Sequence, residues 1–218
     1  MAESNNFPRT VWLGLSLAFG LLSLGYLVSL TEMARAHKTM LPILGNVEDF
    51  TLTNQDGKVT TLADLTNHVW IADIIFTRCA GPCPRMTAQM KSVQDFLPAT
   101  SKAILVTLTT DPGYDSPAMM KRYGERFGAD FSRWTFLTGA KNEISNLAAG
   151  SLKLSAVAKK PDEQQNSADL FIHTTIFVIV DKYAKLRGIF ETGGEDVDWT
   201  NTVEPKLLAT VNRLETEK

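Results

Sequence analysis

A run of twenty residues near the N-terminus carries no charged side chain. It extends from Val11 to Leu30 and reads VWLGLSLAFGLLSLGYLVSL. As a helix, this run would rise about 30 Å, the thickness of the hydrocarbon core of a bilayer. A buried helix of a globular domain is a poorer interpretation, because no helical stripe of the run is polar. We therefore predict a transmembrane anchor at residues 11–30, after a short N-terminal tail at residues 1–10.

A cleaved signal peptide is the alternative to an anchor. The tripeptide at residues 34–36 is Ala-Arg-Ala, which resembles a cleavage site, although the apolar run exceeds the usual 7–15 residues of a signal peptide. Basic residues flank the run on both sides and do not settle its orientation. A short tail and a long C-terminal domain favour a single-pass protein of the cell membrane. Its domain would lie on the periplasmic or extracytoplasmic side.

Composition excludes two broad classes of protein. The formal net charge is −2 and no dense basic run occurs, so we expect no nucleic-acid partner. Two cysteines are too few for a disulfide scaffold. Their role must therefore follow from their spacing and surroundings.

The rest of the chain alternates strands and helices. After a linker at residues 31–46, we expect one domain at residues 47–216, opening with a hairpin at residues 51–62. Apolar runs predict strands at 69–76, 103–108, 134–137, 174–180 and 185–190, and helices at 82–97, 116–127, 142–149 and 203–214. The polar stretch at 159–169 is expected to be a surface loop. This order predicts an α/β thioredoxin-like sandwich with a central mixed β-sheet, preceded by one N-terminal transmembrane helix.

Cys79 and Cys83 lie where a buried strand gives way to a helix. A helix N-terminus stabilises a thiolate and lowers its pKa, and Arg78 adds positive charge beside Cys79. A spacing of four residues places both sulfurs on one side of the first turn. Thiolates are soft ligands that suit Cu(I) or zinc, and two sulfurs leave such a metal in need of a third donor.

Three histidines are available as that donor. His37 lies in the linker and His68 in a turn before a strand, and both are more simply read as exposed side chains. His173 directly precedes the strand TTIFVIV. In a thioredoxin-like sheet, the start of that strand faces the turn that carries the cysteines. A structural role in capping the strand is the alternative for His173.

With these residues identified, the chain resembles the Sco/SenC family of copper-binding cytochrome c oxidase assembly proteins. The matching stretches are VWIADIIFTRCAGPCPRMTAQM, TLTTDPGYDSPAMMKRYGERFGAD, WTFLTG and IHTTIFVIVDKYAKLRGIF. They occur in order, cover most of residues 47–195, and include the C-x-x-x-C motif with a distant histidine. The Gly-Pro-Cys end of the cysteine loop is also similar to the thioredoxin C-G-P-C motif with one residue added.

The resemblance implies a function and a site. It assigns one copper ion, Cu(I) or Cu(II), to Cys79, Cys83 and His173. It also implies a role in building the binuclear copper centre of cytochrome c oxidase, with the copper-receiving subunit of that oxidase as partner. Such a metallochaperone carries metal and need not be an enzyme.

Two carboxylates and two methionines near the cysteines each have two alternative roles. Asp73 lies inside a buried strand and could tune the thiols or bond structurally. Asp111 ends the next strand and could hold a metal ligand in position, or it could simply form the Asp-Pro turn. Met86 and Met90 are expected to fill the core, although thioethers can bind Cu(I).

Other functions remain open for the same cysteines. The main alternative is a thiol–disulfide oxidoreductase that acts on cysteines of a partner protein. His173 discriminates between the two, because a copper site needs a third donor and a reductase does not. A zinc site of two cysteines and one histidine is a third possibility, and a peroxidase is weaker because the expected single peroxidatic cysteine is lacking.

Overall fold

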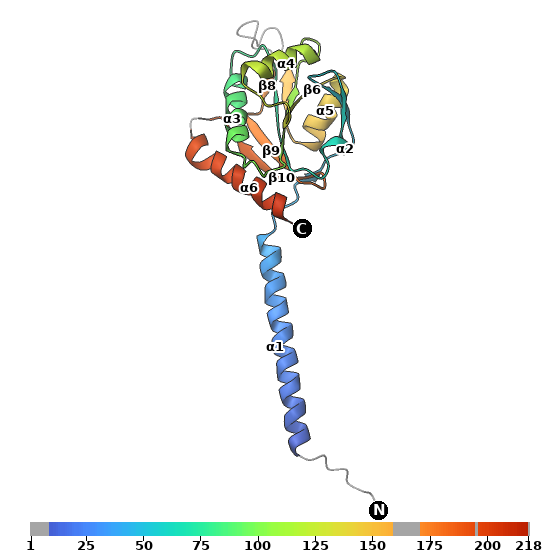
Figure 1. Cartoon of the computed structure of the whole chain (residues 1–218), viewed down its shortest axis with the longest axis vertical. Coiled ribbons are helices and arrows are strands. Elements are labelled where there is room, and N and C mark those ends of the chain that lie inside the picture. Colours follow the sequence, from blue (N-terminus) through green and yellow to red (C-terminus); the bar gives the residue numbers. More distant parts are fainter. Residues whose placement is uncertain (1–8, 159–170, 195, 218) are drawn as a thin grey trace, which may run out of the picture. The chain divides into compact units, whose positions relative to one another are not determined.

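The computed structural model describes residues 9–158, 171–194 and 196–217, and the chain divides into two compact units, Met1–Leu41 and Pro42–Lys218. The first unit contains helix α1, Arg9–Thr39 (Figure 1). Its segment Val11–Leu30 is long and apolar enough to cross a membrane, by length and composition. The apolar run therefore forms a helix as predicted, and this helix continues beyond Leu30 to Thr39.

The second unit is built from short strands and helices. The strands are β1 Gly45–Asn46, β2 Thr51–Asn54, β3 Val59–Thr61, β4 Trp70–Ile75, β5 Ile104–Thr109, β6 Trp134–Thr138, β7 Ala156–Ala158, β8 Phe171–His173, β9 Ile176–Val180 and β10 Lys185–Glu191. The helices are α2 Leu62–Leu65, α3 Cys83–Phe96, α4 Pro117–Arg126, α5 Lys141–Ser145 and α6 Glu204–Thr216. Two π-helical turns, η1 Asn146–Ser151 and η3 Trp199–Val203, precede β7 and α6.

Eight of these strands form one mixed sheet. Their order is β1-β10-β9-β4-β5-β6-β2-β3, with β4 parallel to β5 and antiparallel to β9. All six residues of β4 are buried, as expected for a strand covered on both faces. The predicted thioredoxin-like α/β sandwich with a mixed sheet is therefore confirmed. A separate two-stranded sheet pairs β7 with β8.

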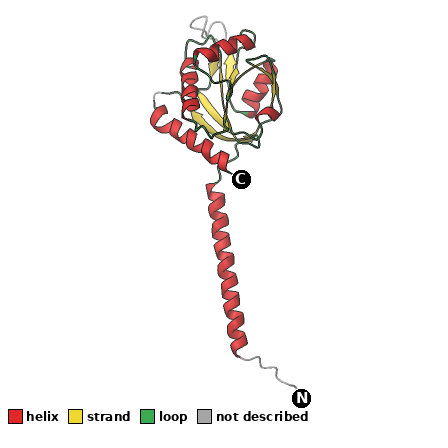
Figure 2. Ribbon diagram, in the orientation of Figure 1, coloured by secondary structure: helices red, strands yellow, loops and turns green. Residues whose placement is uncertain are grey.

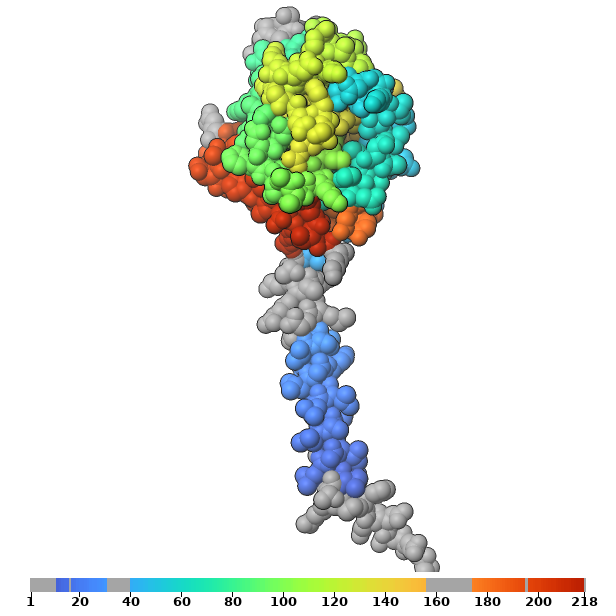
Figure 3. Space-filling model, in the orientation of Figure 1, coloured from blue at the N-terminus to red at the C-terminus, as the bar shows by residue number. Residues whose placement is uncertain are grey.

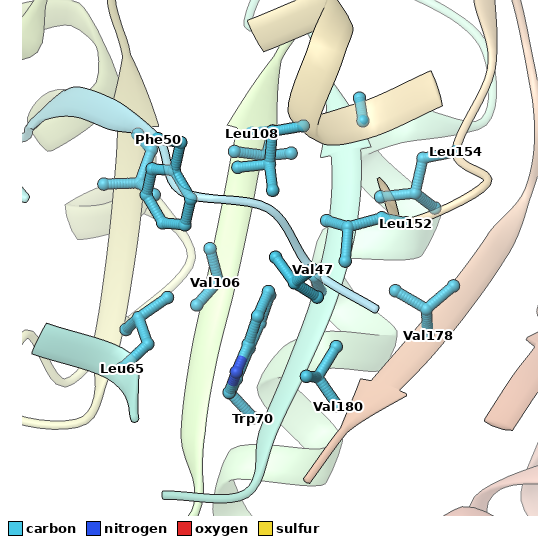
Figure 4. Packing of buried hydrophobic residues seen from close by; sticks show 14 of the residues in the cluster. Val47, Phe50, Leu65, Trp70, Val106, Leu108, Leu152, Leu154, Val178 and Val180 are labelled. Carbon is cyan, nitrogen blue, oxygen red and sulfur yellow. The ribbon is translucent and has the colours of Figure 1, made fainter. Parts of the chain in front are cut away.

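Helices cover both faces of the sheet (Figure 2). Side chains alternate along β4, so Trp70, Ala72 and Ile74 share one face with Val106 of β5 and Val178 of β9 in a single buried cluster. Figure 4 shows Trp70 between Val106 and Val180 in this cluster. The alternate residues of β4, including Asp73, point to the opposite face, where α3 and α6 lie (Figure 1).

Local signals in the sequence account for several element ends. Ser116 caps α4 by accepting a hydrogen bond from the Met119 backbone, and Pro117 occupies the first turn. In the hairpin between β2 and β3, the side-chain oxygen of Asn54 accepts hydrogen bonds from the backbone of Asp56 and Lys58, both 3.0 Å. These bonds, together with Gly57 at φ +75°, close the turn that the sequence predicts.

Two expected elements differ from those observed. The helix predicted at 142–149 is a short α5 followed by η1, in which Leu152 donates its N–H to the Leu147 carbonyl at 2.9 Å. The strand predicted at 174–180 begins only at Ile176. The residues up to His173 belong to a separate strand, β8, in which His173 pairs with Ala156 of β7. The predicted surface loop at 159–169 lies outside the described residues.

Candidate functional site

The cysteine loop connects the buried centre of the sheet to α3. β4 ends at Ile75 and α3 begins at Cys83, so the loop leaves the carboxyl end of the central strand. Cys79 is partly exposed and Cys83 is fully buried. The backbone N–H of Gly81 donates to the sulfur of Cys79 at 3.3 Å. Cys83 is therefore the first residue of the helix, as the sequence predicts, whereas Cys79 lies in the loop before it.

The two thiols influence each other strongly. A hydrogen bond with Cys79 is the largest cause of a raised pKa at Cys83, followed by burial of its thiol. The charges of Cys79 and Asp73 raise this pKa further, while a hydrogen bond to the Phe76 backbone lowers it. The expectation that a helix N-terminus lowers the pKa is therefore wrong for Cys83, because burial and a neighbouring sulfur outweigh the dipole. Without a cation, Cys83 favours its neutral form.

Asp115 holds the beginning of the cysteine loop. Its buried carboxylate accepts hydrogen bonds from the backbone and the hydroxyl of Thr77 and from the hydroxyl of Thr109 at the end of β5. Burial raises the pKa of Asp115, and the bonds from the two threonines oppose that rise. This clamp joins the exits of β4 and β5, two residues before Cys79.

Arg78 and Asp111 form an ion pair beside Cys79. The Arg78 guanidinium donates to one carboxylate oxygen of Asp111 from Nε at 3.0 Å and from Nη2 at 2.7 Å, and it lies 4.5 Å from the centre of the Tyr114 ring. The positive charge that the sequence places next to Cys79 is thus largely compensated by Asp111. Asp111 reaches the cysteine loop through Arg78, which gives it more than a turn-forming role.

His173 ends β8, three residues before β9 begins. Because β9 runs antiparallel to β4, with Ala72 opposite Val178, the start of β9 lies beside the end of β4. Only Thr174 and Thr175 separate β9 from His173 at the end of β8. His173 therefore lies three residues along the chain from the edge at which the cysteine loop leaves, and its side chain is outside the described set.

Contacts from α3 fix the link between β8 and β9. The Gln89 side chain of α3 donates to the Thr192 carbonyl at 2.9 Å, and Thr192 donates its N–H to the Thr175 carbonyl at 2.7 Å. Gly193 lies between Arg85 and Thr175, where an added Cβ would come within 2.5 Å of the Arg85 guanidinium and 2.9 Å of the Thr175 side chain. The helix that starts at Cys83 is therefore tied to the segment that follows His173.

The remaining residues named from the sequence are not at this edge or have structural roles. His68 precedes β4, at the opposite end of that strand from the cysteines, and its Nδ1 hydrogen-bonds the Lys102 carbonyl at 2.9 Å. His37 lies in α1 and its side chain is outside the described set. Met86 and Met90 are fully buried in the core, which confirms their packing role. Among residues with described side chains, no three histidine, cysteine or acidic groups form a metal cluster.

The residues that position the cysteine loop and the segment after His173 are not identified from the sequence. Asp115 belongs to the quoted segment DPGYDSP but has no role assigned from the sequence, and the available signal is its place in the turn between a buried strand and the helix start at Ser116. Gln89 and Gly193 gave no such signal, because their partners are distant in the sequence.

Fold and site together define a class. The chain is a thioredoxin-like protein that carries two cysteines between the end of a central strand and the first turn of a helix. The family model described as SCO1/SenC matches residues 44–207, and the chain belongs to this family.

Individual relatives agree with that assignment. A SCO1 protein homolog of Bacillus subtilis is 36% identical over 162 residues, which cover 72% of this chain and 81% of the relative. The solved structure of BsSco, described as a member of the Sco family of cytochrome c oxidase assembly proteins with a disulfide switch, is 32% identical, with a TM-score of 0.66 and coverage of 82% and 99%. Bradyrhizobium japonicum ScoI with copper bound shares the fold at 20% identity, with a TM-score of 0.63 and coverage of 78% and 99%.

Proposed function

We propose that this chain is a copper metallochaperone that binds one copper ion through Cys79, Cys83 and His173. The observation that supports the proposal is that the loop carrying both cysteines leaves the end of β4 beside the start of β9, and β9 begins three residues after His173. Two sulfurs and one imidazole are a donor set that suits copper. Relatives of the same fold hold copper, among them yeast Sco1 and Bradyrhizobium japonicum ScoI.

The residues around the sulfurs fit a cation as cargo. Cys83 is buried and favours its protonated form, so a bound cation must displace that proton, and copper affinity should rise with pH. Asp73 on the α3 face of β4 places negative charge near Cys83, which favours a cation there. Asp111 supports the site through Arg78.

The proposed recipient is the copper-receiving subunit of cytochrome c oxidase. This step rests on family membership and on BsSco, described as belonging to a family of cytochrome c oxidase assembly proteins. We further propose that α1 anchors the chain as a single membrane span and that the domain lies outside the cytoplasm. The apolar length of α1 supports the anchor.

Copper titration of ligand variants tests the site. Cys79→Ser, Cys83→Ser and His173→Ala should each weaken copper binding by more than about 100-fold. Even residues that only hydrogen-bond a metal ligand contribute about 10–100-fold to metal affinity, and a ligand itself should contribute more. His68→Ala and His37→Ala are matched controls and should leave one ion bound per chain. Unchanged copper affinity in His173→Ala would exclude the three-donor site.

A thiol–disulfide reductase is the second candidate function. One observation favours it: Cys79 is partly exposed whereas Cys83 is buried, which suits an attacking thiol and a resolving thiol. Reduction of a partner disulfide would not need His173. Metal-free disulfide reduction that persists in His173→Ala would support this candidate.

A further inference from the structure

A cavity with a basic lining lies beside the cysteine loop. Its volume is about 330 Å³, and its lining includes Arg78, Tyr114, Arg122, Tyr123 and Arg126. No acidic residue lines the cavity in the described part of the chain. The formal net charge of the chain is −2, so this local cluster of positive charge is opposite in sign to the net charge. We refer to this cavity as the arginine pocket.

The three arginines differ in their ion pairing. Arg78 is paired with Asp111, but neither Arg122 nor Arg126 has an ion-pair partner among the described residues. Both are exposed on α4, whose segment lies at the domain surface in yellow-green (Figure 3). Two guanidinium groups on one helix, neither in an ion pair with a described residue, create a local positive potential that attracts carboxylates.

Packing against neighbouring side chains holds these arginines in place. The Arg126 guanidinium lies 5.1 Å from the centre of the Tyr123 ring and 5.2 Å from that of Phe127. Arg122 contacts the sulfur of Met119 at 2.6 Å. Arginines that are already oriented lose little conformational entropy when they bind an anion.

The arginine pocket is connected to both cysteines. Arg78 directly precedes Cys79 in the loop. On the other side, the Tyr123 hydroxyl hydrogen-bonds the Thr87 hydroxyl at 2.8 Å, and Thr87 donates to the Cys83 carbonyl at 2.9 Å. A group seated in the pocket would therefore contact Arg78, the residue that directly precedes Cys79.

We propose that the arginine pocket docks an acidic segment of the partner protein that exchanges thiols or copper with Cys79. This inference rests on the proposed function, because it assigns the partner's chemistry at the same site. Tyrosine and arginine dominate the binding energy of protein interfaces, and the partly exposed Tyr114 and Arg78 supply both here. The volume suits one or two carboxylate side chains, and the adjacent Cys79 is accessible to a protein surface.

Two synthetic peptides provide the probe. Both contain one disulfide and have the same length, but one carries four Glu beside its disulfide and the other carries four Gln. The reduced full chain in detergent micelles attacks each peptide through Cys79, and Cys83 then resolves the mixed disulfide. Two electrons reduce the peptide disulfide to two thiols while Cys79 and Cys83 form a disulfide, so the reaction balances without another reductant. Rates with dithiothreitol correct for intrinsic differences between the peptides.

The rate ratio between the two peptides reports docking. At low ionic strength the wild type should react about tenfold faster with the Glu peptide, because electrostatic steering raises association rates by about 10–1,000-fold. The preference should fall to parity in the double variant Arg122→Gln/Arg126→Gln and should weaken in high salt. The matched control Lys206→Gln/Arg213→Gln removes the same charge from exposed positions of α6 and should retain it.

The outcomes separate this inference from the proposed function. Equal rates with the two peptides in wild type, or a preference that survives in Arg122→Gln/Arg126→Gln, would overturn the docking role. Copper titration of the same proteins is an independent measurement. If the wild type bound no copper, the carrier function would be contradicted, even if its preference for the Glu peptide remained.

Discussion

At the scale of single residues, Asp115 shapes the site without being a proposed ligand. Its carboxylate accepts three hydrogen bonds that fasten Thr77 and Thr109 to each other across the ends of β4 and β5. Removing a buried acceptor leaves its donors unsatisfied, which is more costly than the loss of an exposed pair. The cysteine loop should therefore depend on Asp115 for its position.

Substitution of Asp115 tests that dependence. Asp115→Ala should reduce the free energy of unfolding by about 1–3 kcal/mol, because buried donors lose their acceptor. Copper affinity should fall as well, since the loop begins at Thr77. Chemical denaturation and copper titration measure the two effects. Asp56→Ala, which breaks the exposed pair with Lys121, should change neither appreciably, and equal behaviour of the two variants would contradict the clamp.

The raised pKa of Cys83 predicts a pH-dependent stability. Its ordinary value is 9.0, and in the folded chain the pKa is higher, so above pH 9 the unfolded chain loses a proton that the folded chain keeps. Unfolding then releases a proton, and stability falls by up to about 1.4 kcal/mol per pH unit. Denaturation of the reduced, metal-free protein from pH 8 to 10 should show a steeper decline than in Cys83→Ser. Parallel declines would show that Cys83 does not contribute.

At this scale, the sequence predicts the proposed copper ligands better than it predicts the residues around them. Cys79 and Cys83 could be found because their spacing and their place between strand and helix are local properties. Asp115, Gln89 and Gly193 could not, because their partners are brought close only by folding. The raised pKa of Cys83 is not predicted either, because burial is a property of the folded chain.

At the scale of elements, the link between β8 and β9 is held against α3 by close packing at Gly193. Hydrogen bonds from Gln89 to Thr192 and from Thr192 to Thr175 run along the same contact. A side chain at residue 193 would separate these elements.

Gly193→Ala tests whether this contact positions His173. The new Cβ would meet Thr175 at 2.9 Å, and overpacking of this kind costs about 1–3 kcal/mol. We expect copper affinity to fall by about tenfold, equivalent to about 1.4 kcal/mol, as the donors move apart. Gly113→Ala is the control, since an added Cβ there meets nothing within 4 Å. Similar copper affinities for the two variants would argue against positioning through Gly193.

Element boundaries show where sequence patterns are sufficient. The central strands were predicted because continuous apolar runs such as residues 69–76 need cover on both faces. The π-helical turn η1 is not predicted, because its hydrogen bonds between residues five apart accompany the packing of Leu147 and Leu152 in the core. The separation of β8 from β9 depends on pairing with β7, which has no local signal.

At the scale of the whole molecule, the chain combines an apolar helix with a thioredoxin-like domain. An anchored carrier should remain in membranes after carbonate extraction, because Val11–Leu30 is long enough to span the hydrocarbon core. Fractionation followed by N-terminal sequencing tests this prediction. A soluble mature protein that begins at His37 would instead indicate a cleaved signal peptide.

Metal-dependent stability distinguishes a carrier from a reductase most directly. A ligand that binds only the folded state at about 1,000 times its Kd adds roughly 4 kcal/mol, which corresponds to a rise in Tm of about 10 °C for a domain of this size. Thermal melting of the reduced protein with and without Cu(I) should show this rise in wild type and not in His173→Ala. No rise in wild type, with metal-free disulfide reduction equally fast in both proteins, would contradict the copper carrier and favour the reductase.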